Sequence, residues 1–455
     1  MVSASPNLGR RFRNTSGIIN VQKFGKVPEL HSKFPEDYVD INTHNTLLKI
    51  KPWAEIASPI RSQFMSSQTK TLQPIVIDKI LVLCVDFEDK PAQVPIETIY
   101  SRFFGDYQNS LKEYFKEVSY SKYIPHGNVH GWYRAPNPST FYTNKENGFG
   151  IYPKSADRLV EEIIEIASKD PDIDWTSFDQ NDNGYIDNII VVHSGTEAAW
   201  TGNVDDFWAH VYVIPEPKII QGRTVWVYAL VSEYLDTPEN YRLVGIDSHE
   251  YGHLLGLPDL YDYSDNSNGV GLYSLMGGGS WALKGSSGVH LDAWSKYILG
   301  FTDTIENPTG TIYLDNAELN PNSILYTTPD PKEYFLMENR QKILYDKYLP
   351  SEGLFIWHIN ENQQYNDNEA CFLVGLIQAD NLKDLENRAN SGDLGDPYPG
   401  IMSNRSFGKN TDPSSILCNG QIQDFLINNI SDSGTTMSFE STIQGPLLSS
   451  PTIRK

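Results

Sequence analysis

Residues 249–259 read His-Glu-Tyr-Gly-His-Leu-Leu-Gly-Leu-Pro-Asp, and the 455-residue chain is best interpreted from this segment outward. His249 and His253 are four residues apart, so on an α-helix both imidazoles leave the same face, close enough to bind one metal ion. Glu250 lies beside them, where its carboxylate can act as general base toward a water on that metal. The spacing therefore predicts a metal-binding helix with a base next to the metal.

The residues after this helix predict a third ligand. Gly256 stands where many helices end in a left-handed residue, and Pro258 cannot continue a helix, so the chain should turn back. The turn brings Asp259 toward the metal. Three protein ligands leave the fourth tetrahedral position of Zn²⁺ for a water, whose pKa the metal lowers from about 15.7 to about 7. An open position is typical of a catalytic zinc site.

A glycine-rich stretch follows at residues 274–281, Ser-Leu-Met-Gly-Gly-Gly-Ser-Trp. Three consecutive glycines suit a backbone that bends sharply close to another element. The stretch is similar to a Met-turn, which places a methionine side chain under the metal ligands. We therefore expect Met276 beneath the zinc site, whereas the stretch taken alone would predict a flexible loop with Met276 in the core.

Gly256 and Asp259 fall at the offsets of the extended metzincin pattern H-E-x-x-H-x-x-G-x-x-H, with Asp in place of the last His. With these residues the chain resembles the M6, or immune inhibitor A-like, family of metallopeptidases, over roughly residues 76–400. The stretches that carry the resemblance are residues 110–120, 127–133, 249–262, 275–281, 288–300, 334–340 and 353–358.

The resemblance implies a zinc endopeptidase of metzincin type, exported and made with an N-terminal pro-segment. It implies that His249, His253 and Asp259 bind zinc. It also implies that Glu250 deprotonates the zinc-bound water and returns the proton to the leaving amine. Asp is a less usual third ligand, and Asp262 is a nearby competitor for that role.

We expect an α+β fold with several parts. Residues 76–303 should form a zincin or metzincin-like catalytic domain, a twisted mixed sheet with the active-site helix. Residues 304–445 predict a β-rich accessory domain, since they contain strand-like runs. Residues 1–75 suit a leader or pro-segment and residues 446–455 a C-terminal tail. The expected elements of the catalytic part are strands at 79–87, 185–193 and 207–214 and helices at 110–118 and 155–169.

One of these strands has a predicted use. Residues 207–214 suit an edge strand beside the active-site cleft, where a peptide substrate can add as a further strand.

A second metal loop is indicated at residues 179–187, Asp-Gln-Asn-Asp-Asn-Gly-Tyr-Ile-Asp. Oxygen-bearing side chains at loop positions 1, 3, 5 and 9, with Gly at 6, are typical of a calcium loop. Position 12 is Ile190 instead of the usual Glu, and Asp182 is a further oxygen donor. The alternative is an Asn/Asp-rich turn. The expected calcium ligands are Asp179, Asn181, Asn183, Tyr185 and Asp187.

The net charge and the hydropathy of the chain restrict the classes of partner that it can bind. With 36 Lys and Arg against 58 Asp and Glu, the net charge of −22 argues against nucleic acid or an anionic membrane as partner. The sequence contains no apolar run of about 18 residues or more, so it predicts no membrane span. No secretory signal is visible at the start, so secretion rests on the resemblance, with an intracellular location as the alternative. Protein or peptide substrates are the expected partners.

The basic leader and the cysteines bear on processing and compartment. Residues 1–80 carry 11 Lys and Arg and 6 Asp and Glu, a balance of +5, while the rest of the chain is acidic. This leader is either a pro-segment lying across an acidic domain or a tail with incidental charge. Cys371 and Cys418 are able to pair across a long loop, which would favour an oxidising compartment. Cys84 suits a buried strand.

The predicted activity is zinc-dependent hydrolysis of peptide bonds in proteins. One alternative is a non-catalytic surface or adhesion module stabilised by Zn²⁺ and Ca²⁺, and another is an H-E-x-x-H aminopeptidase. Glu250 argues against the first, since a structural zinc site is usually closed by four protein ligands and needs no base. Tyr261 and Tyr273 are candidates to stabilise an oxyanion. The remaining buried-type histidines are interpreted as structural: His193, His210, His290 and His358.

Overall fold

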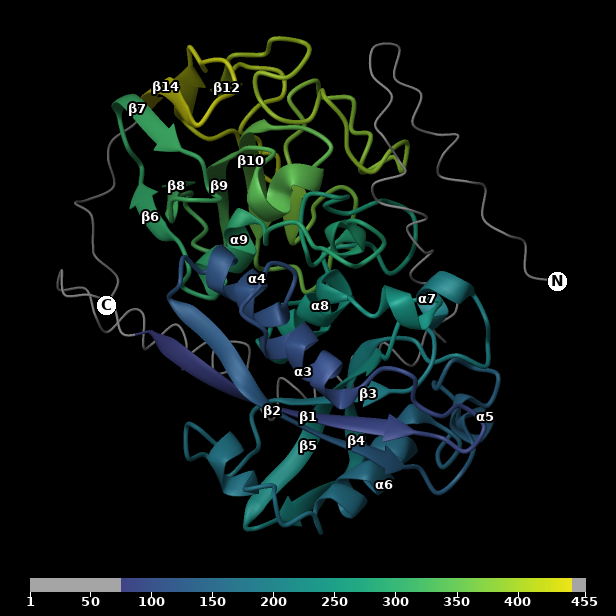
Figure 1. Cartoon of the computed structure of the whole chain (residues 1–455). Coiled ribbons are helices and arrows are strands. Elements are labelled where there is room, and N and C mark those ends of the chain that lie inside the picture. Colours follow the sequence, from purple (N-terminus) through teal and green to yellow (C-terminus); the bar gives the residue numbers. More distant parts are fainter. Residues whose placement is uncertain (1–74, 444–455) are drawn as a thin grey trace.

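The structure, a computed structural model, describes residues 75–443. The predicted leader, apart from Ile75, and the predicted tail at 446–455 therefore lie outside the described residues. Figure 1 shows two parts along the chain, a lower part around one sheet and an upper part built from two further sheets. Within residues 75–443, the helices are too short or too polar to cross a bilayer.

The lower part contains a five-stranded sheet with the order β2-β1-β3-β5-β4. All neighbours are parallel except β4, which runs antiparallel to β5 at one edge. Since β1 is an interior strand between β2 and β3, its apolar run from Ile80 to Val85 is buried on both faces. The strands are β1 (Val76–Asp86), β2 (Tyr123–Arg134), β3 (Ile189–His193), β4 (His210–Ile220) and β5 (Arg223–Ser232).

Helices cover both faces of this sheet (Figure 1). The face with α3, α4 and α8 forms one hydrophobic core, and the face with α6 forms another. Ser110 caps α4 by accepting a hydrogen bond from the backbone N–H of Glu113. The helices are α3 (Ile96–Phe104), α4 (Leu111–Val118), α5 (Ser139–Thr143), α6 (Ala156–Ala167), α7 (Ala198–Thr201), α8 (Val244–Leu254) and α9 (Ala293–Ile298). Short 3₁₀ turns span Trp175–Phe178, Pro238–Asn240, Gly278–Trp281 and Leu344–Tyr348.

The predicted elements of this part are found with shifted ends. The edge strand expected at residues 207–214 is β4, which begins at His210 and continues to Ile220. The strand expected at 185–193 begins only at Ile189. The preceding residues stay in the loop because the Asp187 carboxylate accepts hydrogen bonds from the loop's own Gln180 and Asn181.

The upper part contains two sheets, as the β-rich composition after residue 303 predicts. One has the order β11-β10-β9-β8-β6, the other β12-β13-β14-β7. Cys371 and Cys418 form a disulfide here, which confirms the predicted pairing, and Cys84 is free and buried. The strands are β6 (Asp303–Glu306), β7 (Gly310–Asp315), β8 (Asn322–Tyr326), β9 (Glu333–Arg340), β10 (Gly353–Asn360), β11 (Val374–Leu376), β12 (Phe407–Gly408), β13 (Phe425–Asn428) and β14 (Thr436–Ile443).

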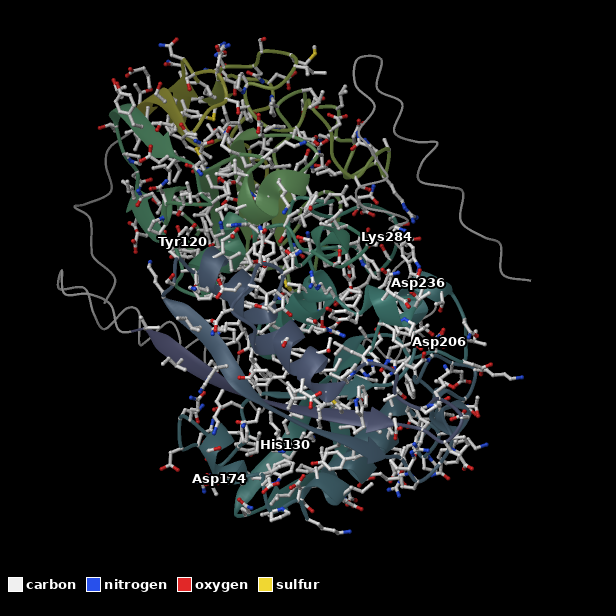
Figure 2. The ribbon with its side chains drawn as sticks, in the orientation of Figure 1. Tyr120, His130, Asp174, Asp206, Asp236 and Lys284 are labelled. Atoms are coloured by element: carbon white, nitrogen blue, oxygen red, sulfur yellow. A yellow bond between two sulfur atoms is a disulfide. The ribbon has the colours of Figure 1, made fainter. Side chains whose placement is uncertain are left out.

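The two parts share a core. One hydrophobic cluster joins Tyr251 and Met276 from the lower part to Phe355 and Trp357 from β10. Polar contacts also cross the junction: the hydroxyl of Tyr120, labelled in Figure 2, donates to the carbonyl of Ala317 at 2.6 Å. The sheets and helices together confirm the α+β class. The two parts bury apolar surface against each other.

Candidate metal centre

Helix α8 carries the two histidines of the predicted motif, and nearly the whole helix is buried. It ends at Leu254, and Gly256 follows with a φ of 99°, the positive value predicted for the turn. Gly245 near the helix start allows close packing, since a Cβ there would lie 2.0 Å from the carbonyl oxygen of Ser280. Both ends of the helix therefore depend on glycine: a larger side chain at residue 245 would clash with the neighbouring backbone, and one at residue 256 would strain the turn.

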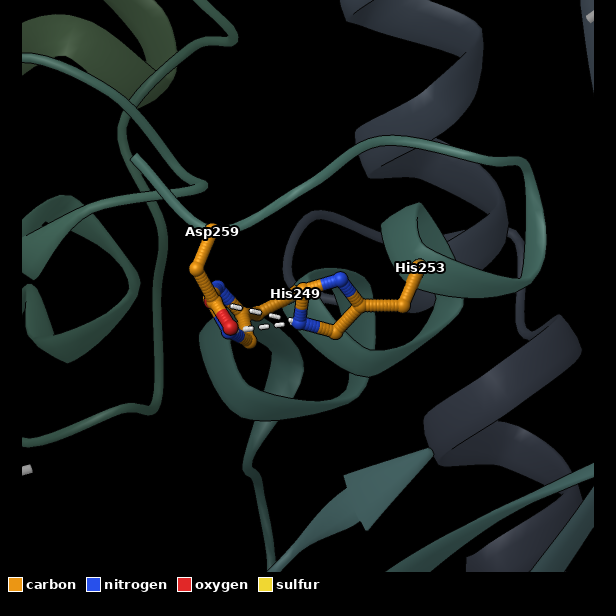
Figure 3. A group of neighbouring side chains, drawn as sticks. All are labelled: His249, His253 and Asp259. Atoms are coloured by element: carbon orange, nitrogen blue, oxygen red, sulfur yellow. Dashed lines mark hydrogen bonds and ion pairs between the residues drawn. The ribbon is translucent and has the colours of Figure 1, made fainter. Parts of the chain in front are cut away.

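His249, His253 and Asp259 converge on one point (Figure 3). The Nε2 atoms of the two histidines are 3.2 Å apart. Oδ1 of Asp259 lies 3.1 Å from Nε2 of His249 and 3.3 Å from Nε2 of His253. His249 and Asp259 are nearly buried, with 7% and 6% of their surface exposed. The structure therefore brings together the three side chains that the sequence singles out.

Hydrogen bonds on the far side of each ring fix which nitrogen faces this point. Nδ1 of His249 lies 2.9 Å from the carbonyl oxygen of Leu275, and Nδ1 of His253 lies 2.8 Å from that of Leu257. A carbonyl oxygen only accepts, so each Nδ1 carries the hydrogen and each neutral ring presents a lone pair at Nε2. Two lone pairs and a carboxylate oxygen then face one another, an arrangement that a cation stabilises. The donor set of two imidazoles and a carboxylate suits Zn²⁺.

The pKa values also show that the cluster attracts positive charge. Burial raises the pKa of Asp259, but the adjacent His253 and His249 outweigh it and hold the pKa well below its usual value. Burial lowers the pKa of His253, but the carboxylate of Asp259 outweighs it and the net pKa is raised. Both pKa shifts have one cause. Two ring nitrogens and a carboxylate oxygen this close together favour a shared positive charge, whether a proton or a metal ion.

Glu250 is 6% exposed and sits next to the cluster in sequence. Within residues 75–443 its Oε2 atom has no hydrogen-bond partner. Burial raises the pKa of Glu250 to about 8, and the nearby Asp259 carboxylate adds to the rise. A buried carboxyl group with one oxygen that has no hydrogen-bond partner and with a raised pKa is suited to take up and release a proton.

Met276 packs directly beneath α8. A Cβ built on Gly252 would lie 2.7 Å from Sδ of Met276, so the helix and the methionine touch only because residue 252 is glycine. Leu275, its neighbour, supplies the carbonyl that holds His249. From β9, Arg340 donates to the carbonyl of Tyr273 just before this segment. The glycine-rich stretch is therefore a fixed support for the helix face that carries His249 and His253.

The two aspartates left open by the sequence have different surroundings. Asp262 accepts hydrogen bonds from Ser264, Asn266 and Ser267, so it closes the following turn and is not part of the cluster. Asp259 is held instead by the hydroxyl of Tyr263, which donates to Oδ2 at 2.6 Å. Sequence reasoning missed Tyr263. Tyr263 lies four residues after Asp259, but a spacing of four residues predicts a contact only within a helix, and this segment is not helical. The contact is therefore not indicated by the sequence.

The two tyrosines proposed for an oxyanion lie in different places. The ring of Tyr261 stacks on that of His249, with centroids 6.2 Å apart. Tyr273 is fully buried, and its hydroxyl bonds to Ser351 and Asp396. Tyr261 therefore borders the metal centre, whereas Tyr273 is committed to contacts with the upper part.

The predicted calcium loop is closed on itself. Asp179 pairs with Arg223, with Oδ2 2.5 Å from Nε, and also accepts hydrogen bonds from the backbone of Asn183 and Gly184. Asp187 accepts hydrogen bonds from Gln180 and Asn181. The carboxylates of this loop thus already have donors, and an Arg guanidinium holds a position where a cation would compete.

Among the described residues, one other group brings three metal-ligand atoms together, Glu333, His358 and Cys418. The sulfur of Cys418 is in the disulfide, so it is not a thiolate ligand, and Glu333 already accepts a hydrogen bond from His358. His193 and His290 are buried and His210 bonds to Tyr228. These contacts agree with a structural interpretation of the four histidines.

Comparisons with known proteins point to the same segment. Residues 93–303 match the family described as Immune inhibitor A peptidase M6, catalytic domain. The chain is 26% identical over 342 residues to the Pre-pro-metalloprotease PrtV of Vibrio cholerae, covering 62% of this chain and 36% of that protein. It is 30% identical over 258 residues to Immune inhibitor A of Bacillus thuringiensis, covering 46% of this chain and 37% of that protein. The chain thus spans little more than a third of the length of these relatives.

Proposed function

We propose that this chain, whose residues 93–303 belong to the M6 family of metallopeptidases, is a zinc-dependent endopeptidase that hydrolyses proteins. The observation that supports this most is the convergence of two Nε2 lone pairs and one carboxylate oxygen beside a buried glutamate. An arrangement with three ligands and an adjacent base is what metal-assisted hydrolysis requires.

We assign a separate role to each side chain. His249, His253 and Asp259 hold Zn²⁺. When bound there, zinc polarises the scissile carbonyl and lowers the pKa of water. Glu250 accepts the proton of the attacking water and delivers it to the departing amine, and its raised pKa suits both directions of transfer.

We also propose that the fold is of the zincin or metzincin type. The mixed, mostly parallel sheet, the buried helix α8 and the methionine packed against Gly252 support this, and residues 274–281 then act as the Met-turn. On this proposal residues 76–303 are the catalytic domain and residues 304–445 the accessory domain. Edge strand β4 would bind the substrate backbone by strand addition, which favours internal peptide bonds over chain ends.

The first experiment compares hydrolysis of casein by wild type and Glu250→Gln, with bound zinc counted by metal analysis. We expect Glu250→Gln to keep its zinc and to lose about 10²–10⁴-fold in kcat. Glu161→Gln is the matched control, because Glu161 is a buried glutamate on α6, across the sheet from α8. A chelator should abolish the activity of wild type and control, and added zinc should restore it.

Three outcomes contradict the proposal. Undiminished turnover by Glu250→Gln removes the glutamate from the mechanism. Bound zinc without hydrolysis by wild type, even after residues 1–75 are removed, favours the alternative of a metal-stabilised binding module. Cleavage restricted to N-terminal residues of defined peptides would favour the aminopeptidase alternative.

We further propose that the protein is exported and made as a latent precursor. The disulfide between Cys371 and Cys418 suits an oxidising compartment, and the name of the Vibrio relative includes "Pre-pro". Removal of residues 1–75 should then raise the hydrolysis rate of an unprocessed preparation. An unchanged rate in the truncated chain contradicts latency.

For the loop from Asp179 to Asp187 we propose a calcium site of low affinity. The oxygen-rich sequence supports binding, while the ion pair between Arg223 and Asp179 opposes it. Calcium titration followed by thermal unfolding of wild type tests this, and the same titration of Asp187→Asn is the control. No shift of the wild-type melting temperature at millimolar calcium contradicts the site.

A further inference from the structure

We propose that residues of the upper part set the affinity of the metal centre by positioning its third ligand, through a relay of hydrogen bonds in which Asp367 holds Tyr263 and Tyr263 holds Asp259, while Asn366 holds the backbone of Leu260. The inference rests on the proposed function and adds positioning residues to it. None of these residues belongs to the H-E-x-x-H motif, and two of them lie more than 100 positions away from Asp259 in the chain.

The relay acts first on the carboxylate of Asp259. Its two oxygens are chemically equivalent until a hydrogen bond distinguishes them. The Tyr263 hydroxyl donates to Oδ2 at 2.6 Å, while Oδ1 has no hydrogen-bond donor within residues 75–443. Oδ1 is the atom that faces both histidine nitrogens. The hydrogen bond from Tyr263 therefore favours a carboxylate rotation that leaves Oδ1 free for a metal, and Tyr261, which also hydrogen-bonds the Asp259 side chain, supports the same carboxylate.

Tyr263 is itself held by the loop between β10 and β11. Its backbone N–H donates to Oδ1 of Asp367 at 2.8 Å. Its ring packs edge-on against that of Tyr365, with centroids 5.4 Å apart and an interplanar angle of 77°. The backbone and the ring of the positioning tyrosine are thus both fixed by the upper part, which limits the directions its hydroxyl can take.

A second contact fixes the backbone next to the ligand. The fully buried Asn366 donates from Nδ2 to the carbonyl of Leu260 at 2.8 Å. The same amide bonds to both backbone groups of Val374, so it is anchored on β11. The N–H of Leu260 in turn donates to the carbonyl of Met276 at 2.8 Å. The residue after Asp259 is therefore held from two sides, by the segment under the helix and by the upper part.

Outer contacts of this kind change metal affinity without changing the ligands. Loss of such a partner typically costs 10–100-fold in affinity or activity. The region after residue 303 is therefore expected to contribute to zinc binding directly, beyond any general effect on folding. A catalytic fragment that ends near residue 303 lacks both Asn366 and Asp367.

The test is the zinc affinity of Tyr263→Phe, measured by competition with a chromophoric chelator. We expect binding about 10–100-fold weaker than wild type. Tyr133→Phe is the matched control, because Tyr133 is also partly buried and also donates to an Asp carboxylate, that of Asp170, at 2.6 Å. The control should bind zinc like wild type.

A double-mutant cycle separates positioning from a general structural effect. In an Asp259→Ala background, Tyr263→Phe should weaken zinc binding no further, since its partner is gone. Asp367→Ala should weaken binding in the same direction but less than Tyr263→Phe. The visible spectrum of the Co²⁺-substituted protein should change in Tyr263→Phe and stay unchanged in Tyr133→Phe.

The outcomes distinguish this inference from the proposed function. A wild-type zinc affinity in Tyr263→Phe, or an equal loss in the presence and absence of Asp259, overturns the positioning role while leaving the peptidase proposal intact. If the wild type binds zinc more tightly than Tyr263→Phe but hydrolyses no protein, the positioning role is supported and the peptidase proposal is contradicted. A wild-type protein that binds no zinc overturns both.

Discussion

The two candidate metal sites of this protein differ in what their oxygen and nitrogen atoms already bind. In the cluster of His249, His253 and Asp259, the atoms that face one another have no hydrogen between them, because the hydrogens are on the far side of each ring. In the loop from Asp179 to Asp187, the carboxylates are taken up by backbone N–H groups and by Arg223.

This difference shows that spacing alone is a weak sign of a metal site. Both segments carry a recognisable pattern, and both bring polar side chains close together. A metal ion adds most where lone pairs converge without a donor, since burying such atoms unpaired costs about 1–3 kcal/mol each. Where donors are already present, a metal must displace them, and the net gain is small.

The largest expected effect comes from removing one carboxylate from each site. Asp259→Ala should lose more than about 100-fold in zinc affinity, since changes outside the ligand set already cost 10–100-fold. Asp179→Ala should leave zinc affinity unchanged. Isothermal titration of both variants with zinc measures the contrast, and equal effects would mean that the two sites are not distinguished by free lone pairs.

A smaller effect is expected from adding one methyl group to each site. In Gly252→Ala the new Cβ meets Met276 Sδ at 2.7 Å, so the helix or the methionine must shift, at about 1–3 kcal/mol. This shift should also weaken zinc binding. In Gly184→Ala the space is open but φ is 89°, so only backbone strain is added and zinc affinity should not change. Denaturant unfolding with parallel zinc titration tests both.

His193 and His210 lie outside both candidate metal sites, and they predict how the stability of the fold depends on pH. Burial lowers the pKa of His193 to about 3 and that of His210 to about 4, so the unfolded chain binds more protons below its ordinary pKa of about 6.5. Stability should therefore be full above pH 6.5 and fall as the pH drops from there toward about 4. Urea unfolding of the wild type across this range measures the loss, and a stability that does not fall below about pH 6.5 would contradict it.

The smallest expected effect concerns the competing guanidinium in the loop. Arg223→Ala frees the carboxylate of Asp179 and removes a positive charge, so calcium should stabilise this variant more than wild type. The measurement is the rise in melting temperature with calcium for the two proteins. A smaller rise in Arg223→Ala would show that Arg223 supports the loop instead of competing with calcium.

Sequence reasoning was most successful where the geometry is local. The period of the helix places His249 and His253 on one face whatever the rest of the chain does, and the buried strand and the capped helix α4 follow from equally short patterns. The positive φ of Gly256 has the same origin, since a helix that stops before proline needs such a turn. The likeness to M6 peptidases rests on these same segments.

Contacts between distant segments were only partly accessible. The pairing of Cys371 with Cys418 was predicted from the sequence only as a possibility, and the structure confirms it. The start of the strand predicted at residue 185 was misplaced because side chains of a polar loop bond within that loop. No pattern indicated that hydrophobic cores before and after residue 303 are continuous.

By itself the sequence determined the pair of histidines, the glutamate beside them and the turn that follows, because rotation per residue in a helix fixes these positions. Only the tertiary structure placed Asp259, and not Asp262, beside the two histidines, placed Met276 under Gly252 and brought Tyr263 onto Asp259. These contacts depend on hydrogen-bond donors and apolar side chains that other segments of the fold supply. The distance of those segments in space cannot be predicted from their spacing in the sequence.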